Sequence, residues 1–117
     1  MKKLLVFALF LLLVGCGRNT AVENPGSDLD EPDKVLYDRA IGELKRNRYT
    51  VARLALQTLI NTYPDSEYLP QAKFGLAETF YQEGTTAMLN QAETEFKDYI
   101  TFFPATDLAD DAQLMVA

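Results

Sequence analysis

The sequence contains no histidine and no tryptophan, and its 117 residues include a single cysteine. The absence of histidine removes the commonest general base and the commonest metal ligand. With one cysteine, no disulfide can form within the chain, whatever the compartment. The sequence also holds no glycine-rich phosphate loop, no nucleophile elbow and no metal-ligand spacing. We therefore expect neither an enzyme nor a protein that carries a metal or a dissociable cofactor.

The lone cysteine, Cys16, follows a basic start and an apolar run over residues 4–14. This pattern is typical of a secretory signal peptide, and the run falls short of the about 20 residues that span a bilayer. The string LVGC at 13–16 resembles the bacterial lipobox. That resemblance implies cleavage after residue 15, with diacylglycerol and an N-acyl chain (a palmitate) on Cys16, enough for stable anchoring. The alternative is a secreted protein with an unmodified cysteine.

The part of the chain beyond the predicted signal peptide is acidic. Lys2 and Lys3 lie within that peptide, which leaves nine of the eleven basic residues against seventeen acidic ones. A net charge of about −8 is repelled by the phosphates of nucleic acid and of anionic lipid. We expect no nucleic-acid partner, and membrane attachment through the lipid anchor alone.

Residues 16–31 are rich in Gly, Asn, Pro, Ser and Asp, with little to bury. We interpret them as a flexible tether with a reach of about 20–25 Å. The alternative is a short ordered arm that packs on the folded part.

The folded part contains an internal duplication. The strings LINTYP at 59–64 and YITFFP at 99–104 match in character, forty residues apart. Ala52 pairs with Ala92 and Leu56 with Phe96 in the same frame. A fixed period of this length indicates a repeated structural unit.

Each unit is predicted to be a pair of helices, over about 33–46 and 50–63, and then about 68–83 and 88–103. Asp33 is a candidate N-cap, and Asn47 stands where a left-handed C-terminal residue is expected. Pro64 and Gly84 each end a helix. Asp107 is predicted to cap a further helix from residue 108.

The spacing of small and large residues resembles the tetratricopeptide repeat. The match covers Tyr49-x2-Ala52-x3-Leu56-x2-Leu59-x4-Pro64, with three extra residues near 85–87 in the second unit. This implies an all-α fold that forms a right-handed α-solenoid, with repeat 1 over 32–64, repeat 2 over 65–104 and the first helix of a truncated repeat 3 over 105–117. Arg39 and Glu43 depart from the motif, which usually has apolar residues there. We expect residues 32–117 to be marginally stable, with the segment after Asp107 frayed.

Acidic pairs are the only candidates for catalysis, as in a glycosidase. The neighbours Asp110 and Asp111 diverge by roughly 100° on a helix, so they cannot act on one substrate together. Glu93 and Glu95 diverge as well. A solvated helix face is the better interpretation.

In tetratricopeptide repeats the first helices line a concave groove. Aromatic side chains there can hold an extended peptide. For some of these residues, and above all for Phe74, packing against the next repeat is the alternative. The residues that map to the exposed groove positions are Lys34, Tyr37, Lys45, Gln71, Phe74, Glu78 and Tyr81.

The lipobox, the polar tether, the start Leu36-Tyr37-x2-Ala40 and the two repeats together resemble the BamD family of outer-membrane assembly lipoproteins. The resemblance implies a scaffold of the β-barrel assembly (BAM) machinery, lipid-anchored on the periplasmic face of the outer membrane. Gly17 after the cysteine agrees with outer-membrane sorting. Implied partners are unfolded outer-membrane protein precursors, a BamA-type β-barrel subunit and the other lipoproteins of the machinery. The alternative is another repeat lipoprotein, such as a pilus-assembly pilotin or an adaptor in peptidoglycan synthesis.

Overall fold

The computed structural model describes residues 31–117 and shows an all-α arrangement over that part of the chain. Its helices are α2 (Pro32–Lys45), α3 (Tyr49–Thr62), α4 (Leu69–Glu83), α5 (Thr86–Phe102) and α6 (Asp107–Val116). The predicted all-α class is confirmed, while the right-handed α-solenoid stays a prediction. The predictions for the signal peptide, for Cys16 and for nearly all of the tether lie outside the described residues.

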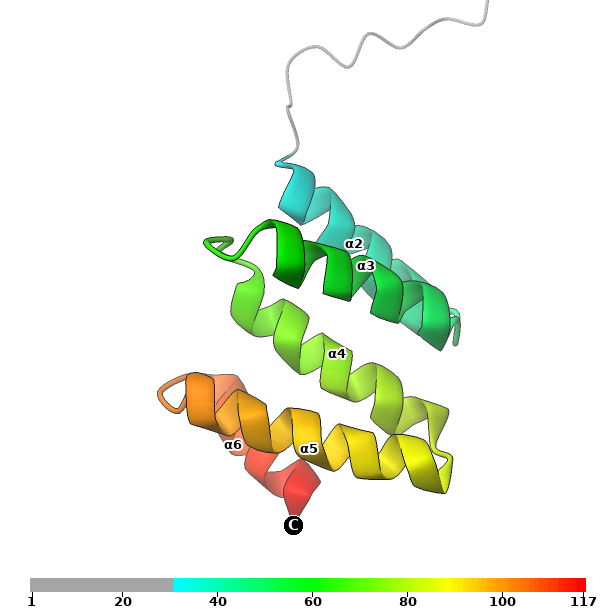
Figure 1. Cartoon of the computed structure of the whole chain (residues 1–117), viewed down its shortest axis with the longest axis vertical. Helices are drawn as coiled ribbons and strands as arrows, with labels where there is room; N and C mark the ends of the chain where they lie inside the picture. The colour runs from blue at the N-terminus through cyan, green and yellow to red at the C-terminus, as the bar shows by residue number, and fades with distance from the viewer. Residues whose placement is uncertain (1–30) are drawn as a thin grey trace, which may run out of the picture.

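The helices follow one another down a stack (Figure 1). Each helix packs on the next in chain order, and α4 also touches α2 and α6. In Figure 1, α2 lies behind α3 and α6 lies behind α5, while α4 runs between α3 and α5. We call α2, α4 and α6 the first-helix layer, and α3 and α5 the second-helix layer.

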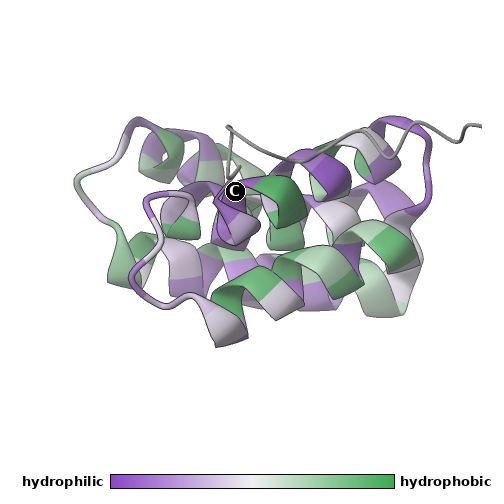
Figure 2. Cartoon of the chain, turned by 90° about the horizontal axis from the view of Figure 1, so that it is seen from above, coloured by the Kyte–Doolittle hydropathy of each residue, from purple (hydrophilic) through white to green (hydrophobic). Residues whose placement is uncertain are grey.

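Two hydrophobic clusters hold this stack together. The first is mainly aliphatic and centres on Leu56 and Leu59, both fully buried. The second is mainly aromatic and centres on Phe96 and Tyr99. Burial of such side chains contributes about 1.5–3 kcal/mol each. Figure 2 shows hydrophobic and hydrophilic residues alternating along the helices, as expected where each helix buries one stripe.

Small residues set how closely the helices approach. Ala40, Ala52 and Ala77 are completely buried, and Ala92 is 1% exposed. Gly75 lies against Leu56, where an added Cβ would stand 3.4 Å from the leucine Cδ1. A side chain larger than alanine at these four alanines would force the helices apart.

The turns within the two helix pairs use left-handed residues, as predicted. Asn47 has a φ of 59° between α2 and α3. Gly84 has a φ of 72° and donates its N–H to the carbonyl of Phe80 at the end of α4. Asparagine and glycine tolerate this conformation better than other residues.

The helix starts differ from the prediction. Asp33 does not cap α2: Glu31 takes that position and Pro32 the first turn, where its fixed φ suits a helix start. The carboxylate of Asp33 accepts a hydrogen bond from the Ser66 hydroxyl instead. Likewise Asp107 lies inside α6, whose N-cap is Thr106.

The α4–α5 pair contains more helical residues near its turn than the α2–α3 pair does. α3 begins at Tyr49, one residue earlier than predicted, and α5 begins at Thr86, two residues earlier. Thr85 caps α5, since its hydroxyl accepts a hydrogen bond from the Met88 N–H at 3.3 Å. α5 has 17 residues against 14 in α3, so it absorbs the three extra residues of the second repeat.

Candidate functional site

The first-helix layer brings together side chains from three helices. Burial raises the pKa of Tyr37 on α2, and the negative charges of Glu78 and Asp38 raise it further. Burial also raises the pKa of Glu78 on α4, and the charge of Asp111 on α6 adds to that. Glu78 on α4 therefore lies near enough to interact electrostatically with Tyr37 on α2 and with Asp111 on α6. With the exposed Gln71 and Tyr81 of α4, these three residues form what we call the first-helix face.

Tyr37 is held in place by a second aromatic residue. Its ring stacks on that of Tyr68 with a centroid distance of 5.4 Å and an interplanar angle of 25°. Tyr68 is the N-cap residue of α4, and burial is the main cause that raises its pKa. Tyr68 was not among the predicted site residues, although an aromatic residue at the start of the helix beside α2 was a usable signal.

The other predicted residues on these helices are spread along the surface. The Lys34 ammonium pairs with Asp38 one turn later, at 2.8 Å. Lys45 is exposed in the last turn of α2, and Gln71 is exposed in the first turns of α4. Tyr81 is 46% exposed. The positive charge of Lys34 opposes the rise in the pKa of Tyr68, so Lys34 lies near the stacked tyrosines, whereas Lys45 lies at the other end of α2.

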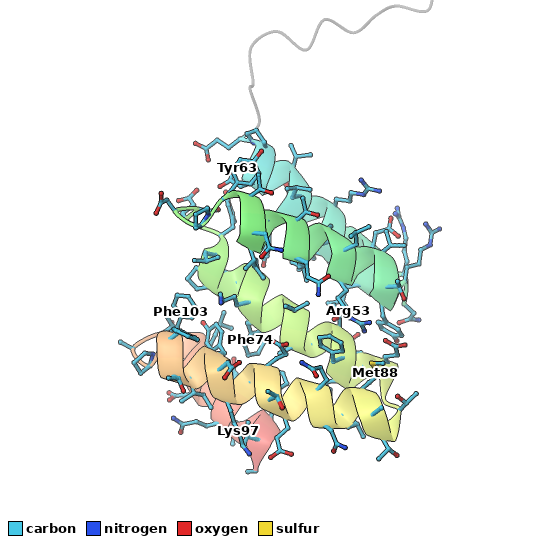
Figure 3. The ribbon with its side chains drawn as sticks, viewed as in Figure 1. Arg53, Tyr63, Phe74, Met88, Lys97 and Phe103 are labelled. Atoms are coloured by element: carbon cyan, nitrogen blue, oxygen red, sulfur yellow. The ribbon has the colours of Figure 1, made fainter. Side chains whose placement is uncertain are left out.

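Phe74 is half-buried within the second cluster. Its ring meets Phe96 edge-on at 5.4 Å and Tyr99 at 5.6 Å. Figure 3 shows Phe74 beside α5, on the side of α4 that faces that helix. These contacts with α5 agree with the packing alternative for Phe74, so we leave it out of the first-helix face.

Arg53 on α3 is a structural residue that was not among the predicted ones. Only 14% of its side chain is exposed. Its guanidinium donates to the Thr79 hydroxyl at 3.2 Å and to the carboxylate of Glu83, and it lies 3.9 Å above the Phe80 ring. All three partners are on α4, so Arg53 joins the two helix pairs, between which it lies in Figure 3.

The acidic residues considered for catalysis have surface roles. Glu93 pairs with Lys97 one turn later, and Glu95 accepts a hydrogen bond from Gln91 at 2.9 Å. Asp110 and Asp111 are exposed. Across residues 31–117, no three potential ligands gather in a way that would hold a metal ion. Over the same residues, no helix has the length and hydropathy needed to cross a bilayer.

A stack of paired helices with tetratricopeptide spacing defines an all-α, tetratricopeptide-like protein. Comparison with known proteins gives the family. Residues 29–117 match the family YfiO, described as outer membrane lipoprotein, and the chain belongs to this family.

The chain is also similar to a curated protein, the outer membrane protein assembly factor BamD of Xylella fastidiosa (strain Temecula1). The two are 28% identical over 99 residues. The aligned part covers 85% of this chain and 32% of the relative, so the chain spans about a third of that protein's length.

Proposed function

We propose that this chain is a lipid-anchored scaffold of the outer-membrane β-barrel assembly machinery. The observation that carries the proposal is membership of an outer membrane lipoprotein family, together with similarity to a protein named as an assembly factor. The scaffold performs no chemistry of its own: it holds other proteins together at the periplasmic face of the membrane.

Attachment is assigned to Cys16. The LVGC string supplies the lipid-accepting cysteine, and diacylglycerol with an N-acyl chain is sufficient for stable anchoring. Residues 16–31 then act as the tether that leads into α2. This arrangement needs no membrane-spanning helix from residues 31–117.

Binding of unfolded precursors is assigned to the first-helix face. An unfolded β-barrel segment is extended and rich in aromatic side chains, and it offers unpaired backbone donors and acceptors. Tyr37 and Tyr81 supply aromatic surface at low conformational cost, while Gln71 and Glu78 supply hydrogen-bonding groups. The stack of Tyr37 on Tyr68 fixes one of these rings before a ligand arrives.

The partners in the machinery are a BamA-type β-barrel subunit and the other assembly lipoproteins. The relative is about three times as long as the aligned part, and we assign these contacts to the length that lies beyond it. Residues 32–64 and 65–104 are assigned to precursor binding as repeats 1 and 2.

The test is affinity purification of the tagged protein from detergent-solubilised envelopes of the organism that encodes it. We expect recovery of a large β-barrel partner together with unfolded outer-membrane precursors. Recovery of pilus subunits or of peptidoglycan synthases, without a β-barrel partner, would overturn the proposal. A Cys16→Ser variant is expected to move from the membrane fraction to the soluble fraction of the envelope.

A further inference from the structure

The turn between α2 and α3 is built around one carboxylate. Glu43 is 9% exposed, and its backbone carbonyl accepts hydrogen bonds from the N–H groups of Arg46 and Arg48, at 3.1 and 3.0 Å. Its carboxylate accepts a hydrogen bond from the guanidinium group of each arginine, both at 3.2 Å. Asn47, with its left-handed backbone, lies between the two arginines. Glu43 therefore organises both the backbone and the side chains of this turn.

This arrangement holds two guanidinium groups side by side. Arg46 donates to one carboxylate oxygen and Arg48 to the other. The two arginine side chains are 64% and 62% exposed, so most of their N–H donors face solvent. Glu43 is the sole acidic residue within ion-pair distance of either arginine in the part of the chain that the structure describes. We call Arg46 and Arg48, fixed on Glu43, the arginine pair.

The arginine pair lies at the cationic end of an acidic protein. Lys45 is exposed beside it, which makes three cations against one carboxylate in the turn. The opposite ends of the helices carry Glu31, Asp33, Asp65, Glu67 and Asp107. Figure 1 shows the α2–α3 turn at one end of the helices and the α3–α4 and α5–α6 turns at the other. The two ends therefore differ in charge, with Lys34 as a cation at the acidic end and Glu83, paired with Arg53, as a carboxylate at the other.

We propose that the arginine pair is a carboxylate-binding site that docks an acidic segment of a protein partner. Two fixed guanidinium forks match the geometry of carboxylates, and their positions are already set by Glu43 before binding. A protein is favoured over a lipid surface because α2 begins at the opposite, acidic end of the helices, so the described chain enters the fold at the end farthest from the arginine pair.

The test measures binding of a fluorescent Glu-Ser repeat peptide to the full chain in detergent. We expect saturable binding that weakens as salt rises, since exposed charges are screened. In the triple variant Glu43→Gln, Arg46→Gln, Arg48→Gln, affinity should fall roughly tenfold. Glu43 is changed as well so that no buried carboxylate loses its partners. The matched control is Lys97→Gln on α5, which removes one exposed cation elsewhere and should leave affinity unchanged.

A second variant separates geometry from charge. Arg46→Lys with Arg48→Lys keeps both charges and removes the planar forks, so we expect an intermediate loss of affinity, roughly threefold. Equal binding by the triple variant and the original chain would overturn the proposal. So would an equal loss in Lys97→Gln, or binding to phosphatidylglycerol vesicles in place of the peptide. Binding of an unfolded precursor peptide should persist in all these variants. A failure of this proposal can therefore be distinguished from a failure of the proposed function.

Discussion

The two helix pairs share one repeat frame but are stabilised in different ways. At equivalent positions the first pair has Leu56 and Leu59, where the second has Phe96 and Tyr99. The first pair closes its turn on a buried charge, Glu43, whereas the second uses Gly84 and a longer α5. The repeat therefore fixes where small and large residues stand, while the chemistry at each turn and in each cluster differs between the pairs.

The largest expected effect comes from the two cores. Phe96→Ala should lower the free energy of unfolding by about 4 kcal/mol, and Leu56→Ala, forty residues earlier, by about 3 kcal/mol. Both side chains are fully buried, and the phenylalanine leaves the larger cavity. Urea unfolding of the two variants measures the difference. A smaller loss for Phe96→Ala than for Leu56→Ala would show that the second cluster collapses to fill the space.

A smaller effect is expected where the two pairs meet. Arg53→Ala should cost about 2 kcal/mol, because the side chain is largely buried and loses Thr79, Glu83 and the ring of Phe80. At the equivalent position of the second pair, Glu93→Ala should cost less than about 0.5 kcal/mol, since its pair with Lys97 is exposed. Thermal unfolding of both variants makes the comparison. Equal losses of stability in the two variants would show that Arg53 does not stabilise the contact between α3 and α4.

Substitutions in the α2–α3 and α4–α5 turns should change stability by less than those at the cores and at Arg53. Gly84→Ala places a Cβ on a left-handed residue and should cost about 1 kcal/mol. Asn47→Gly removes the steric cost of a side chain at a positive φ, and it should change the free energy of unfolding by less than about 0.5 kcal/mol. Chemical denaturation of each variant is the measurement. A cost for Asn47→Gly above that of Gly84→Ala would show that the contact of the Asn47 side chain with the Tyr49 hydroxyl governs the first turn.

The smallest effect concerns pH. The hydrogen bond from Ser66 lowers the pKa of Asp33 below its ordinary value of 3.8. The stability that Asp33 contributes is therefore complete above pH 3.8 and is lost as pH falls through the lowered pKa. Burial raises the pKa of Glu78, so stability falls as pH rises from its ordinary value of 4.5 through the raised pKa. Asp33→Asn should reduce the loss of stability as pH falls below 3.8. Glu78→Gln should remove the loss of stability as pH rises above 4.5. Unfolding measured across this range checks both slopes, and slopes of the same sign would contradict the assignment.

Local features of the chain were predictable from its sequence. Asn47 and Gly84 end helices through their own backbone freedom, and the buried alanines follow from the repeat spacing. Contacts between helices were harder to predict. The partners of Arg53 and Phe74 depend on which helix crosses which face, and Tyr68 was identified only as a helix start. Asp33 was predicted to cap α2 because Asp suits that position, but Pro32 shifts the start of the helix.

In the proposed function, the first-helix face receives unfolded outer-membrane precursors. The most direct measurement places a photo-crosslinking amino acid at Tyr37, at Tyr81 and, as the control on the second-helix layer, at Lys97 in the full chain inside the envelope. We predict crosslinks to newly exported β-barrel precursors from positions 37 and 81 and none from position 97. Crosslinks from position 97 alone, or no precursor at any of the three positions, would contradict the account.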